Sequence, residues 1–441
     1  MDFEDLARSI VERLRASGHA AYFVGGCVRD LLLGRAPKDY DVATSARPNE
    51  ILSLFPGANT VGAHFGVVLV HHGSAQVEVA TFRADLEYRD GRHPEGVRFE
   101  NEPREDILRR DFSINALLLD PATGEIMDFV NGRADLEARL IRAIGDPERR
   151  FREDHLRLLR AVRFAARLGF TIEPQTFEAI RLLAPLIGNV SAERVRDEVA
   201  RILTEGGARR GFELLDATGL LHEVLPEIEA LKGVEQPPEF HPEGDVWTHT
   251  LIMLEGLREP SPELALGVLL HDVGKPTTFR IAERIRFDGH VEKGVEIAHR
   301  LLTRLRFPQS VIETTEALIA NHMRFGEVTR MRESTLKRLI RMPEFDDHLE
   351  LHRLDCLSSH GSLANYDFVS RKRTELPPEQ LKPPRLVTGR DLIDAGYKPG
   401  PEFSVVLDEI EDAQLEGRIA TREEGLLVAR ERFAGFATIR S

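Results

Sequence analysis

Residues 20–41, which read AAYFVGGCVRDLLLGRAPKDYD, decide how the N-terminal part of the chain folds. The apolar run at 20–24 predicts a strand, and the glycines that follow it, Gly25 and Gly26, predict a tight turn. Backbone N–H groups in such a turn can approach a phosphate, and Arg29 adds a fixed positive fork. The turn is therefore a candidate phosphate site.

An Asp-x-Asp motif, Asp39 and Asp41, follows this turn. Residues two apart on a strand point to the same face, so we expect the two carboxylates to hold hard cations such as Mg²⁺ together. The turn and the motif together predict a site for a nucleoside triphosphate and its metal ions. The alternative is a glycine turn beside two unrelated surface acids, which would explain either half alone.

Five motifs that begin with this stretch follow one another along the chain. They lie at residues 22–34, 38–44, 77–83, 109–117 and 152–164. In this order they resemble the signatures of the class II tRNA nucleotidyltransferase and bacterial poly(A) polymerase superfamily. The resemblance implies a polymerase-β-like head, transfer of nucleotides from ATP and CTP to the 3′ end of tRNA, and Mg²⁺ held by Asp39 and Asp41.

The third and fourth motifs add candidates to this site. The strand at 77–83 resembles the one that carries a third acid, so we expect Glu78 near the attacking hydroxyl. The alternative for Glu78 is a solvated residue of an edge strand. Arg110, in the fourth motif, is expected to help bind the nucleotide, together with Gly25, Gly26 and Arg29.

Asp154 and Arg157 predict which bases are accepted. A carboxylate only accepts hydrogen bonds and a guanidinium only donates them, so the pair fits the amino group and ring nitrogen of cytosine or adenine. Uracil and guanine present the reverse order and are rejected, because they leave buried polar groups unpaired. We expect the two side chains to share a helix face. The alternative is an ordinary ion pair on a helix surface.

Arginines are concentrated just after the head, although the net charge of the chain is −14. Between residues 138 and 170 nine arginines stand against four acids, which predicts a local positive face. Arg160 and Arg163 continue the face of Arg157 and are expected to reach the triphosphate or the primer. The alternative is a salt-bridged helix surface. The negative net charge of the whole chain argues against a protein that coats nucleic acid without selectivity.

The polar segment 84–94 predicts a mobile loop. In the resembled family such a loop is associated with addition of the terminal A. Its presence therefore argues against an enzyme that adds only CC.

A second constellation lies in the C-terminal half. His249, the adjacent pair His271 and Asp272, and Asp355 have the order of an HD-type phosphohydrolase domain. The resemblance implies a divalent ion whose identity stays open among Mg²⁺, Mn²⁺, Ni²⁺ and Co²⁺, and hydrolysis of phosphoesters such as cyclic nucleotides or RNA 3′ ends. Two further histidines fall where some members of that superfamily bind a second ion; they are His290 and His322.

The pattern of apolar residues predicts an α+β protein. An N-terminal helix at 6–16 and strands near 20–24, 39–43, 66–71, 76–82 and 113–119 form the head, and the rest is helical. We expect a head at 1–140, a helical neck at 141–232, an HD-type domain at 233–376 and a helical tail at 377–441 that contacts the tRNA body. The Pro- and Glu-rich stretch 233–245 predicts a linker, and Thr388 with Asp391 predicts a helix start.

Composition is typical of a cytoplasmic protein. The hydrophobic content is 42%, the start of the chain is acidic, and the two cysteines, Cys27 and Cys356, imply no disulfide framework. No apolar run approaches the length of a membrane helix, so we expect no membrane partner. The oligomeric state stays open.

Three functions are compatible with these observations. The first is a tRNA nucleotidyltransferase that adds or repairs the 3′ CCA. The second is an enzyme that adds only A, or a poly(A) polymerase, although the acidic tail lacks the basic extension that poly(A) polymerases usually carry. The third is an HD phosphohydrolase with an RNA-binding head, against which the intact Asp39 and Asp41 argue.

Overall fold

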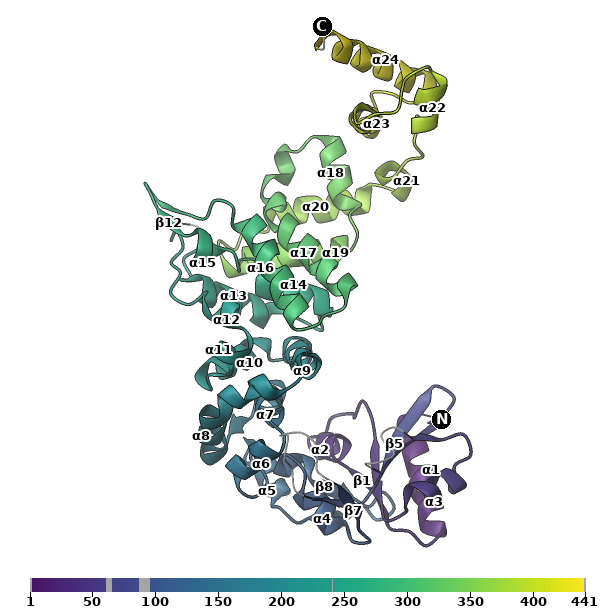
Figure 1. Cartoon of the computed structure of the whole chain (residues 1–441), viewed down its shortest axis with the longest axis vertical. Coiled ribbons are helices and arrows are strands. Elements are labelled where there is room, and N and C mark those ends of the chain that lie inside the picture. Colours follow the sequence, from purple (N-terminus) through teal and green to yellow (C-terminus); the bar gives the residue numbers. More distant parts are fainter. Residues whose placement is uncertain (1, 61–65, 87–95, 240, 440–441) are drawn as a thin grey trace. The chain divides into compact units, whose positions relative to one another are not determined.

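A mixed sheet forms the centre of the N-terminal part of the chain (Figure 1). The structure is a computed structural model that describes residues 2–60, 66–86, 96–239 and 241–439. Within these residues the sheet has seven strands in the order β3-β4-β5-β2-β1-β8-β9. Their bounds are Ala21–Val24 (β1), Asp41–Thr44 (β2), Asn59–Thr60 (β3), Val67–His72 (β4), Ala75–Thr81 (β5), Leu117–Leu119 (β8) and Ile126–Asp128 (β9).

Strand β2 lies inside the sheet, antiparallel to β1 and parallel to β5. Helix α1 (Phe3–Ala16) packs on β1, β2 and β5. Its apolar face repeats every four residues and is buried; it includes Leu6, Ile10 and Leu14. The helix therefore anchors the strands that carry the acidic motif.

The turn after β1 takes the conformation that the glycine pair predicts. Gly25 has φ +82°, a region that side chains rarely adopt, and helix α2 (Gly26–Leu32) begins at the next residue. The chain thus passes directly from strand to helix, and the free N–H groups of the first helical turn lie at the end of the sheet.

Helices form most of the remaining N-terminal half. In the head they are α3 (Pro48–Leu54), α4 (Pro103–Leu108) and α5 (Gly132–Glu137), and short strands pair as β6 (Arg83–Asp85) with β7 (Val97–Phe99) and β10 (Leu140–Ile141) with β11 (Thr171–Ile172). The following helices are α6 (Pro147–Glu153), α7 (Arg157–Leu168), α8 (Pro174–Leu183), α9 (Ala192–Thr204), α10 (Ala208–Ala217), α11 (Leu220–Val224) and α12 (Pro226–Glu229).

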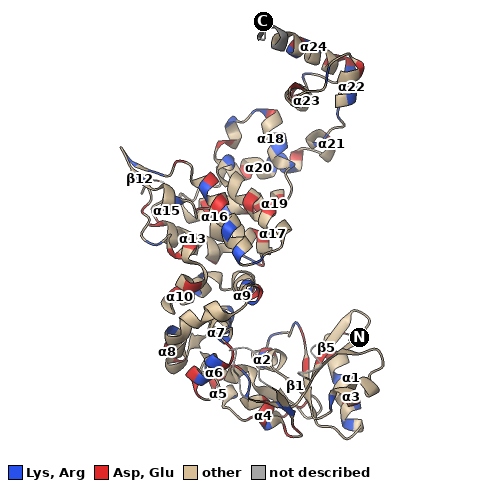
Figure 2. Ribbon diagram, viewed as in Figure 1, with Lys and Arg blue, Asp and Glu red and all other residues tan. Residues whose placement is uncertain are grey.

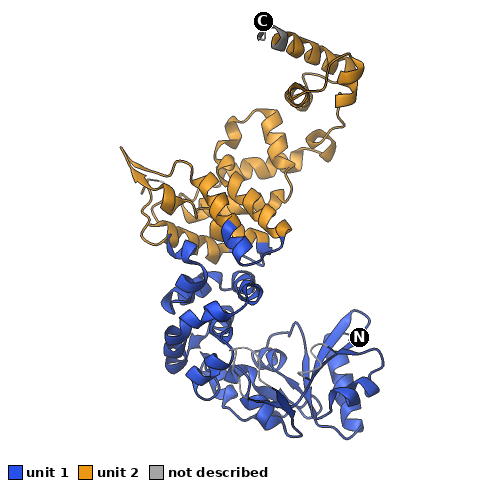
Figure 3. Ribbon diagram, in the orientation of Figure 1, with its two compact units in different colours: residues 1–230, 257–262, 300–308 blue, residues 231–256, 263–299, 309–441 orange. Residues whose placement is uncertain are grey.

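The chain divides into two compact units (Figure 3). Unit 1 contains residues 1–230, 257–262 and 300–308, and unit 2 contains residues 231–256, 263–299 and 309–441.

Unit 2 is helical apart from a small hairpin of β12 (Arg280–Ile281) and β13 (Ile285–Arg286). Its central helices are α13 (Val246–Gly256), α14 (Pro262–Leu270), α15 (Lys275–Thr278), α16 (His290–Arg304), α17 (Gln309–Asn321), α18 (Glu333–Ile340), α19 (Phe345–Ser358) and α20 (Ala364–Glu375), with a 3₁₀ segment at His322–Arg330. The tail has α21 (Pro378–Leu381), α22 (Gly389–Asp394), α23 (Glu402–Leu415) and α24 (Arg422–Ile439).

Most of the predicted elements are present. The helix at 6–16, the strands near 20–24, 66–71 and 76–82 and the Thr388–Asp391 capping box agree with the prediction, whereas the strand predicted near 39–43 begins only at Asp41. The fifth strand is wrong in its first half, because Ser113–Asn115 forms a 3₁₀ turn and β8 begins only at Leu117. The sequence also missed the β12–β13 hairpin, since strands of two residues carry no alternation of apolar and polar side chains.

No helix among the described residues is both long enough and apolar enough to cross a membrane.

Gly132 offers a test of the packing in the head. It opens α5, and a Cβ atom there would clash with the carbonyl oxygen of Ser113 and lie 3.1 Å from Leu117 Cδ2. Because backbone atoms cannot move aside cheaply, we expect Gly132→Ala to lower the free energy of unfolding by about 1–3 kcal/mol in urea titrations. Gly188→Ala is the control, since nothing lies within 4 Å of the place that its Cβ atom would occupy. Equal stability of the two variants would contradict this packing.

Candidate functional site

Three carboxylates come together in the head. Asp41 opens β2 and lies opposite Glu78 of β5 in the parallel register. Burial, Glu78 and Asp39 raise the pKa of Asp41 to about 7, and only Arg110 opposes them. Carboxylates that repel one another in this way form a site for cations, and an all-oxygen donor set suits Mg²⁺.

The prediction that Asp39 and Asp41 lie on one strand is wrong. Asp39 lies in a bend before β2, whose first residue is Asp41, so the two residues are not neighbours on one strand. Among the described residues, groups of three possible ligands with their ligand atoms within 4.8 Å of one another occur only in unit 2. Asp39, Asp41 and Glu78 therefore do not all bring carboxylate oxygens within 4.8 Å of one another, although Asp39 and Glu78 both act on Asp41.

The glycine turn keeps space open beside Asp41. A Cβ atom on Gly25 would lie 3.6 Å from both Arg110 Nη1 and Asp41 Oδ2, and one on Gly26 would lie 3.7 Å from Arg29 Nη2. The place of the missing Gly25 side chain therefore lies between the Asp41 carboxylate and the Arg110 guanidinium, and that of Gly26 lies beside Arg29. Nε of Arg110 is buried and has no hydrogen-bond partner among the described residues, although Nη2 donates to Asp106 at 3.1 Å.

Arg29 lies under the turn and is buried. Its Nε donates to Asp30 Oδ1 at 2.8 Å, its Nη1 donates to Asn115 Oδ1 at 2.7 Å, and its guanidinium lies 5.4 Å from the centre of the Phe164 ring. The side chain is fixed from both the head and α7. It is a rigid positive charge rather than a mobile one.

The prediction that Asp154 and Arg157 share one helix face is wrong. Asp154 has extended backbone angles at the end of α6, and α7 begins only at Arg157. Asp154 accepts a hydrogen bond from Nη2 of Arg194 at 3.0 Å. Arg157 donates to the carbonyl oxygens of Arg109 and Arg150 at 3.1 and 2.9 Å.

Asp154 therefore contacts Arg194, and Arg157 contacts backbone carbonyl groups. The two residues stand at the end of α6 and the start of α7, on either side of the break between these helices. Arg194, on α9, was not singled out in the sequence, because nothing local marks a residue forty positions away as a partner of Asp154.

Arg160 and Arg163 already have acidic partners. Arg160 Nη2 lies 2.6 Å from Asp111 Oδ2, and Arg163 Nε lies 2.6 Å from Glu198 Oε2 in a buried pair. The guanidinium groups lie 5.3 and 4.3 Å from the centre of the Phe164 ring.

The predicted positive face at 138–170 is therefore largely neutralised. Figure 2 shows both signs of charge on and around α6. Acids from outside the segment supply the balance, which a count within the segment could not include; they are Asp111, Asp135, Glu173, Glu198 and Glu205. Arg149 and Arg152 keep exposed side chains.

The predicted loop lies largely outside the described residues, which omit 87–95. Its two ends pair as β6 and β7, with Arg83 opposite Phe99.

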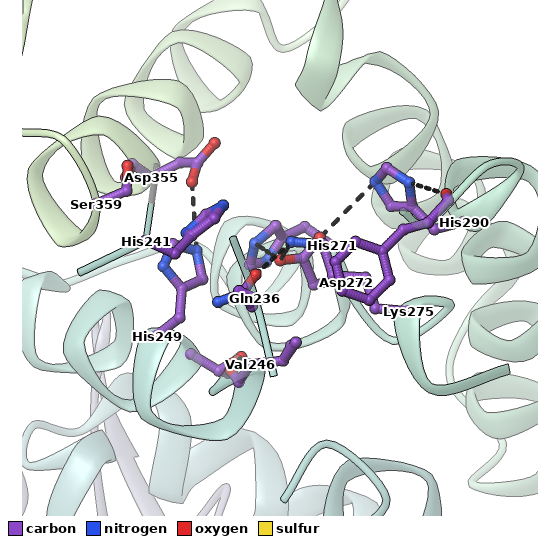
Figure 4. A network of polar contacts seen from close by, with 12 residues as sticks. Gln236, His241, Val246, His249, His271, Asp272, Lys275, His290, Asp355 and Ser359 are labelled. Atoms are coloured by element: carbon purple, nitrogen blue, oxygen red, sulfur yellow. Dashed lines mark hydrogen bonds and ion pairs between the residues drawn. The ribbon is translucent and has the colours of Figure 1, made fainter. Parts of the chain in front are cut away.

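Unit 2 brings all six predicted HD residues together. Figure 4 labels five of them: His249, His271, Asp272, His290 and Asp355. His249 lies on α13, His271 and Asp272 follow α14, and Asp355 lies on α19. One group of ligand atoms within 4.8 Å consists of His249, His271 and Asp355, and a second consists of Asp272, His290 and His322. The two groups adjoin, since Nε2 of His271 lies 3.1 Å from Asp272 Oδ2.

The histidine rings are oriented by their other nitrogen. Nδ1 of His271, His290 and His322 lies 2.9, 2.9 and 2.6 Å from the carbonyl oxygens of residues 268, 287 and 319. A carbonyl only accepts, so each Nδ1 carries the hydrogen and each Nε2 keeps a free lone pair. Among the described residues, these three Nε2 atoms and Oδ1 of Asp272 are buried without hydrogen-bond partners, whereas Nε2 of His249 lies 3.3 Å from Asp355 Oδ1. Such a donor set fits a divalent metal ion.

The stretch 233–245, predicted to be a linker, contributes to this centre. Glu243 Oε1 lies 2.7 Å from His249 Nδ1 and 2.9 Å from His241 Nδ1, and Gln236 accepts from Lys275 Nζ at 2.7 Å. Burial lowers the pKa of His249, but hydrogen bonds with Asp355 and Glu243 outweigh it and raise that pKa to about 9. The sequence missed these residues because proline and glutamate content alone is typical of linkers.

Family models match three parts of the chain. The poly(A) polymerase head domain matches residues 21–142, a probable RNA and SrmB-binding site of polymerase A matches residues 169–232, and the HD domain matches residues 245–352.

Similar proteins cover the whole chain. A CCA-adding enzyme of Streptococcus pneumoniae is 30% identical over 95% of this chain and 95% of its own length. One from Geobacillus stearothermophilus is 46% identical over 48% of this chain, and the match spans about half (53%) of that relative. The crystal structure of the Bacillus stearothermophilus CCA-adding enzyme in complex with CTP covers 98% of both chains with a TM-score of 0.75 and 28% identity.

The raised pKa of Asp41 predicts a pH-dependent stability in the absence of metal. Because its folded pKa of about 7 exceeds the ordinary value of 3.8, its contribution is present below about pH 4 and is lost as the pH rises through 7. In EDTA we expect the melting temperature of the wild type to fall from pH 5 to pH 8 by more than that of Asp41→Asn. Added Mg²⁺ should reverse this difference at pH 8. Identical pH profiles of the two proteins would refute the clustering of these acids.

Proposed function

Because the chain belongs to the family of CCA-adding enzymes, we propose that it is a tRNA nucleotidyltransferase that adds or repairs the 3′ CCA of tRNA from CTP and ATP without a nucleic-acid template. The observation that carries this proposal is the meeting of Asp39, Asp41 and Glu78 beside the Gly25–Gly26 turn. An acidic cluster next to a phosphate turn is what transfer of a nucleotide requires.

Each residue of the head has a role in this proposal. Asp39 and Asp41 hold Mg²⁺, which when bound neutralises charge on the departing pyrophosphate. The turn places Gly25 and Gly26 against the triphosphate, with Arg29 and Arg110 as fixed cations on either side. Glu78 lies beside Asp41 and orients the 3′ hydroxyl of the primer.

Base choice is assigned to the joint between α6 and α7. Asp154 accepts from the amino group of C or A, and Arg157 donates to the ring nitrogen, so U and G are rejected. This requires Asp154 to exchange Arg194 for the base. Arg160 and Arg163 lie on the next turns of α7 and position the triphosphate or primer through the Phe164 cluster.

The remaining assignments follow the order of the chain. We propose a head at 1–140, a neck at 141–232, an HD-type domain at 233–376 and a tail at 377–441 that contacts the tRNA body. Both cysteines are buried free thiols, which suits a cytoplasmic location.

The test is addition of nucleotides to tRNA transcripts that end before CCA, before A or after A, with each triphosphate supplied separately. The wild type should stop after CCA. The double variant Asp39→Ala, Asp41→Ala should lose at least about a hundredfold in rate, because nothing else holds the metal ions. Glu125→Ala, which removes an exposed acid of the head, should retain wild-type activity.

Other outcomes select the alternatives. Continued addition of A would identify a poly(A) polymerase, and incorporation of A alone would identify an enzyme specific for the last step. Absence of incorporation by the folded wild type would leave an HD phosphohydrolase with an RNA-binding head. A double variant with wild-type rate would refute the role of the acids.

A second function is favoured by the inward-facing nitrogens of unit 2. We propose that His249, His271, Asp272 and Asp355 hold one divalent ion and that His290 and His322 hold another beside Asp272. The nitrogen and oxygen donors fit Mn²⁺, Ni²⁺ or Co²⁺ and less well Mg²⁺. With such ions bound, the site would hydrolyse phosphoesters, such as cyclic nucleotides or RNA 3′ ends.

Metal content tests this second proposal. After dialysis against Mn²⁺, Ni²⁺ or Co²⁺ and removal of loose ions, the wild type should retain about two ions per chain in unit 2 by elemental analysis. His322→Ala should lose about one of them and the hydrolysis of bis(p-nitrophenyl) phosphate, while CCA addition persists. His299→Ala, an exposed histidine of the same unit, is the control. Equal metal content in the wild type and His322→Ala would contradict the assignment.

A further inference from the structure

The pocket over the HD centre has a wall that neither the metal ligands nor their partners form. Its volume is about 700 Å³, and it reaches from His271 and Asp272 to the hairpin β12–β13. Residues 284–288 of this hairpin and the turn after it line the pocket. They include two arginines, Arg284 and Arg286.

Arg286 is in an unusual state for a guanidinium. Its side chain is half-buried, and its Nε is shielded from solvent without a hydrogen-bond partner. No hydrogen bond or ion pair of its side chain occurs with the part of the chain that the structure describes. Buried N–H groups are nearly always paired, so an unpaired one in a pocket marks the place of a ligand.

The hairpin register leaves this charge uncompensated. Arg286 lies directly opposite Arg280 in the antiparallel pair, an arrangement that like charges destabilise. Arg280 is balanced by an ion pair with Asp288. Arg286 has no such acid among the described residues, and its positive charge is therefore directed to whatever occupies the pocket.

The other two cationic side chains of the pocket, Lys275 and Arg284, are not in the same situation as Arg286. Nζ of Lys275 lies 2.6 Å from Asp272 Oδ2 and 2.7 Å from Gln236 Oε1, so it serves the metal ligand. Arg284 is exposed, and water can satisfy its donors. Arg286 is thus the pocket arginine with a donor, Nε, that is shielded from solvent and has no partner among the described residues.

We propose that Arg286 binds the phosphoryl group of the ligand at the HD centre, an inference that rests on the proposed phosphoester hydrolysis. A guanidinium presents parallel donors that match two oxygens of a phosphate, a geometry that a point charge such as a lysine ammonium lacks. A phosphoryl group has enough oxygens to contact metal ions and Arg286 together. The ligand class is a small phosphoester or its product, inorganic phosphate.

The experiment measures binding of inorganic phosphate to the full chain loaded with Mn²⁺, by equilibrium dialysis. Arg286→Ala should weaken phosphate binding at least about tenfold, and Arg286→Lys should recover part of it, because a bidentate contact becomes a single one. Arg284→Ala removes the same charge from the same hairpin and should change affinity less than about twofold. Metal content and melting temperature should stay at wild-type values in all three variants.

The possible outcomes distinguish phosphate binding by Arg286 from the proposed phosphoester hydrolysis. Loss of phosphate binding in Arg286→Ala supports the inference even if the wild type hydrolyses no phosphoester, in which case only the hydrolase proposal fails. Wild-type affinity in Arg286→Ala, equal weakening in Arg284→Ala, or absence of phosphate binding by the wild type overturns it. For hydrolysis, Arg286→Ala should raise KM for bis(p-nitrophenyl) phosphate more than it lowers kcat.

Discussion

The parallel register of β2 and β5 is the constraint on which the head depends. It sets Asp41 opposite Glu78 with Asp39 close by, at a buried point where carboxylates repel one another. Such a cluster lowers the stability of the fold unless cations bind to it. The sheet therefore places acids where a bound ion, rather than a side chain, balances most of their charge. Folding and ion binding are therefore linked in the head, because the same strands that form the sheet create the repulsion.

In unit 2, hydrogen bonds orient the candidate metal ligands. Backbone carbonyls hold Nδ1 of three histidines, and Glu243 holds Nδ1 of His249. The Nε2 atom of each ring then faces a carboxylate: that of His249 faces Asp355, and those of the other three histidines face Asp272. Helix ends do this well, since their last carbonyls lack partners within the helix. The ligand set is thus ordered before any ion arrives.

The arginines after the head serve mainly to join elements. Arg157 connects the joint between α6 and α7 to the end of α4, and Arg163 binds α7 to α9 through Glu198. Arg160 and Arg163 are paired with acids of other elements, Asp111 and Glu198, and a nucleotide or tRNA phosphate would have to compete with those acids. The free energy of RNA or nucleotide binding then depends on replacing these ion pairs by contacts with phosphate, and not on an open basic surface. This agrees with the acidic net charge of the chain.

The sequence by itself determined the strand and glycine turn at 20–26, the acidic motif, the order of the HD ligands and the helix start at Thr388, because these depend on residues close together along the chain. Only the tertiary structure decided that Asp39 lies before the strand, that α6 and α7 break between Asp154 and Arg157, and that Glu243 of the predicted linker contacts His249. The partners that decide these features, such as Arg194 for Asp154, stand far away in the chain. Local patterns of apolar and polar residues carry no signal for pairings that arise only when distant segments pack together.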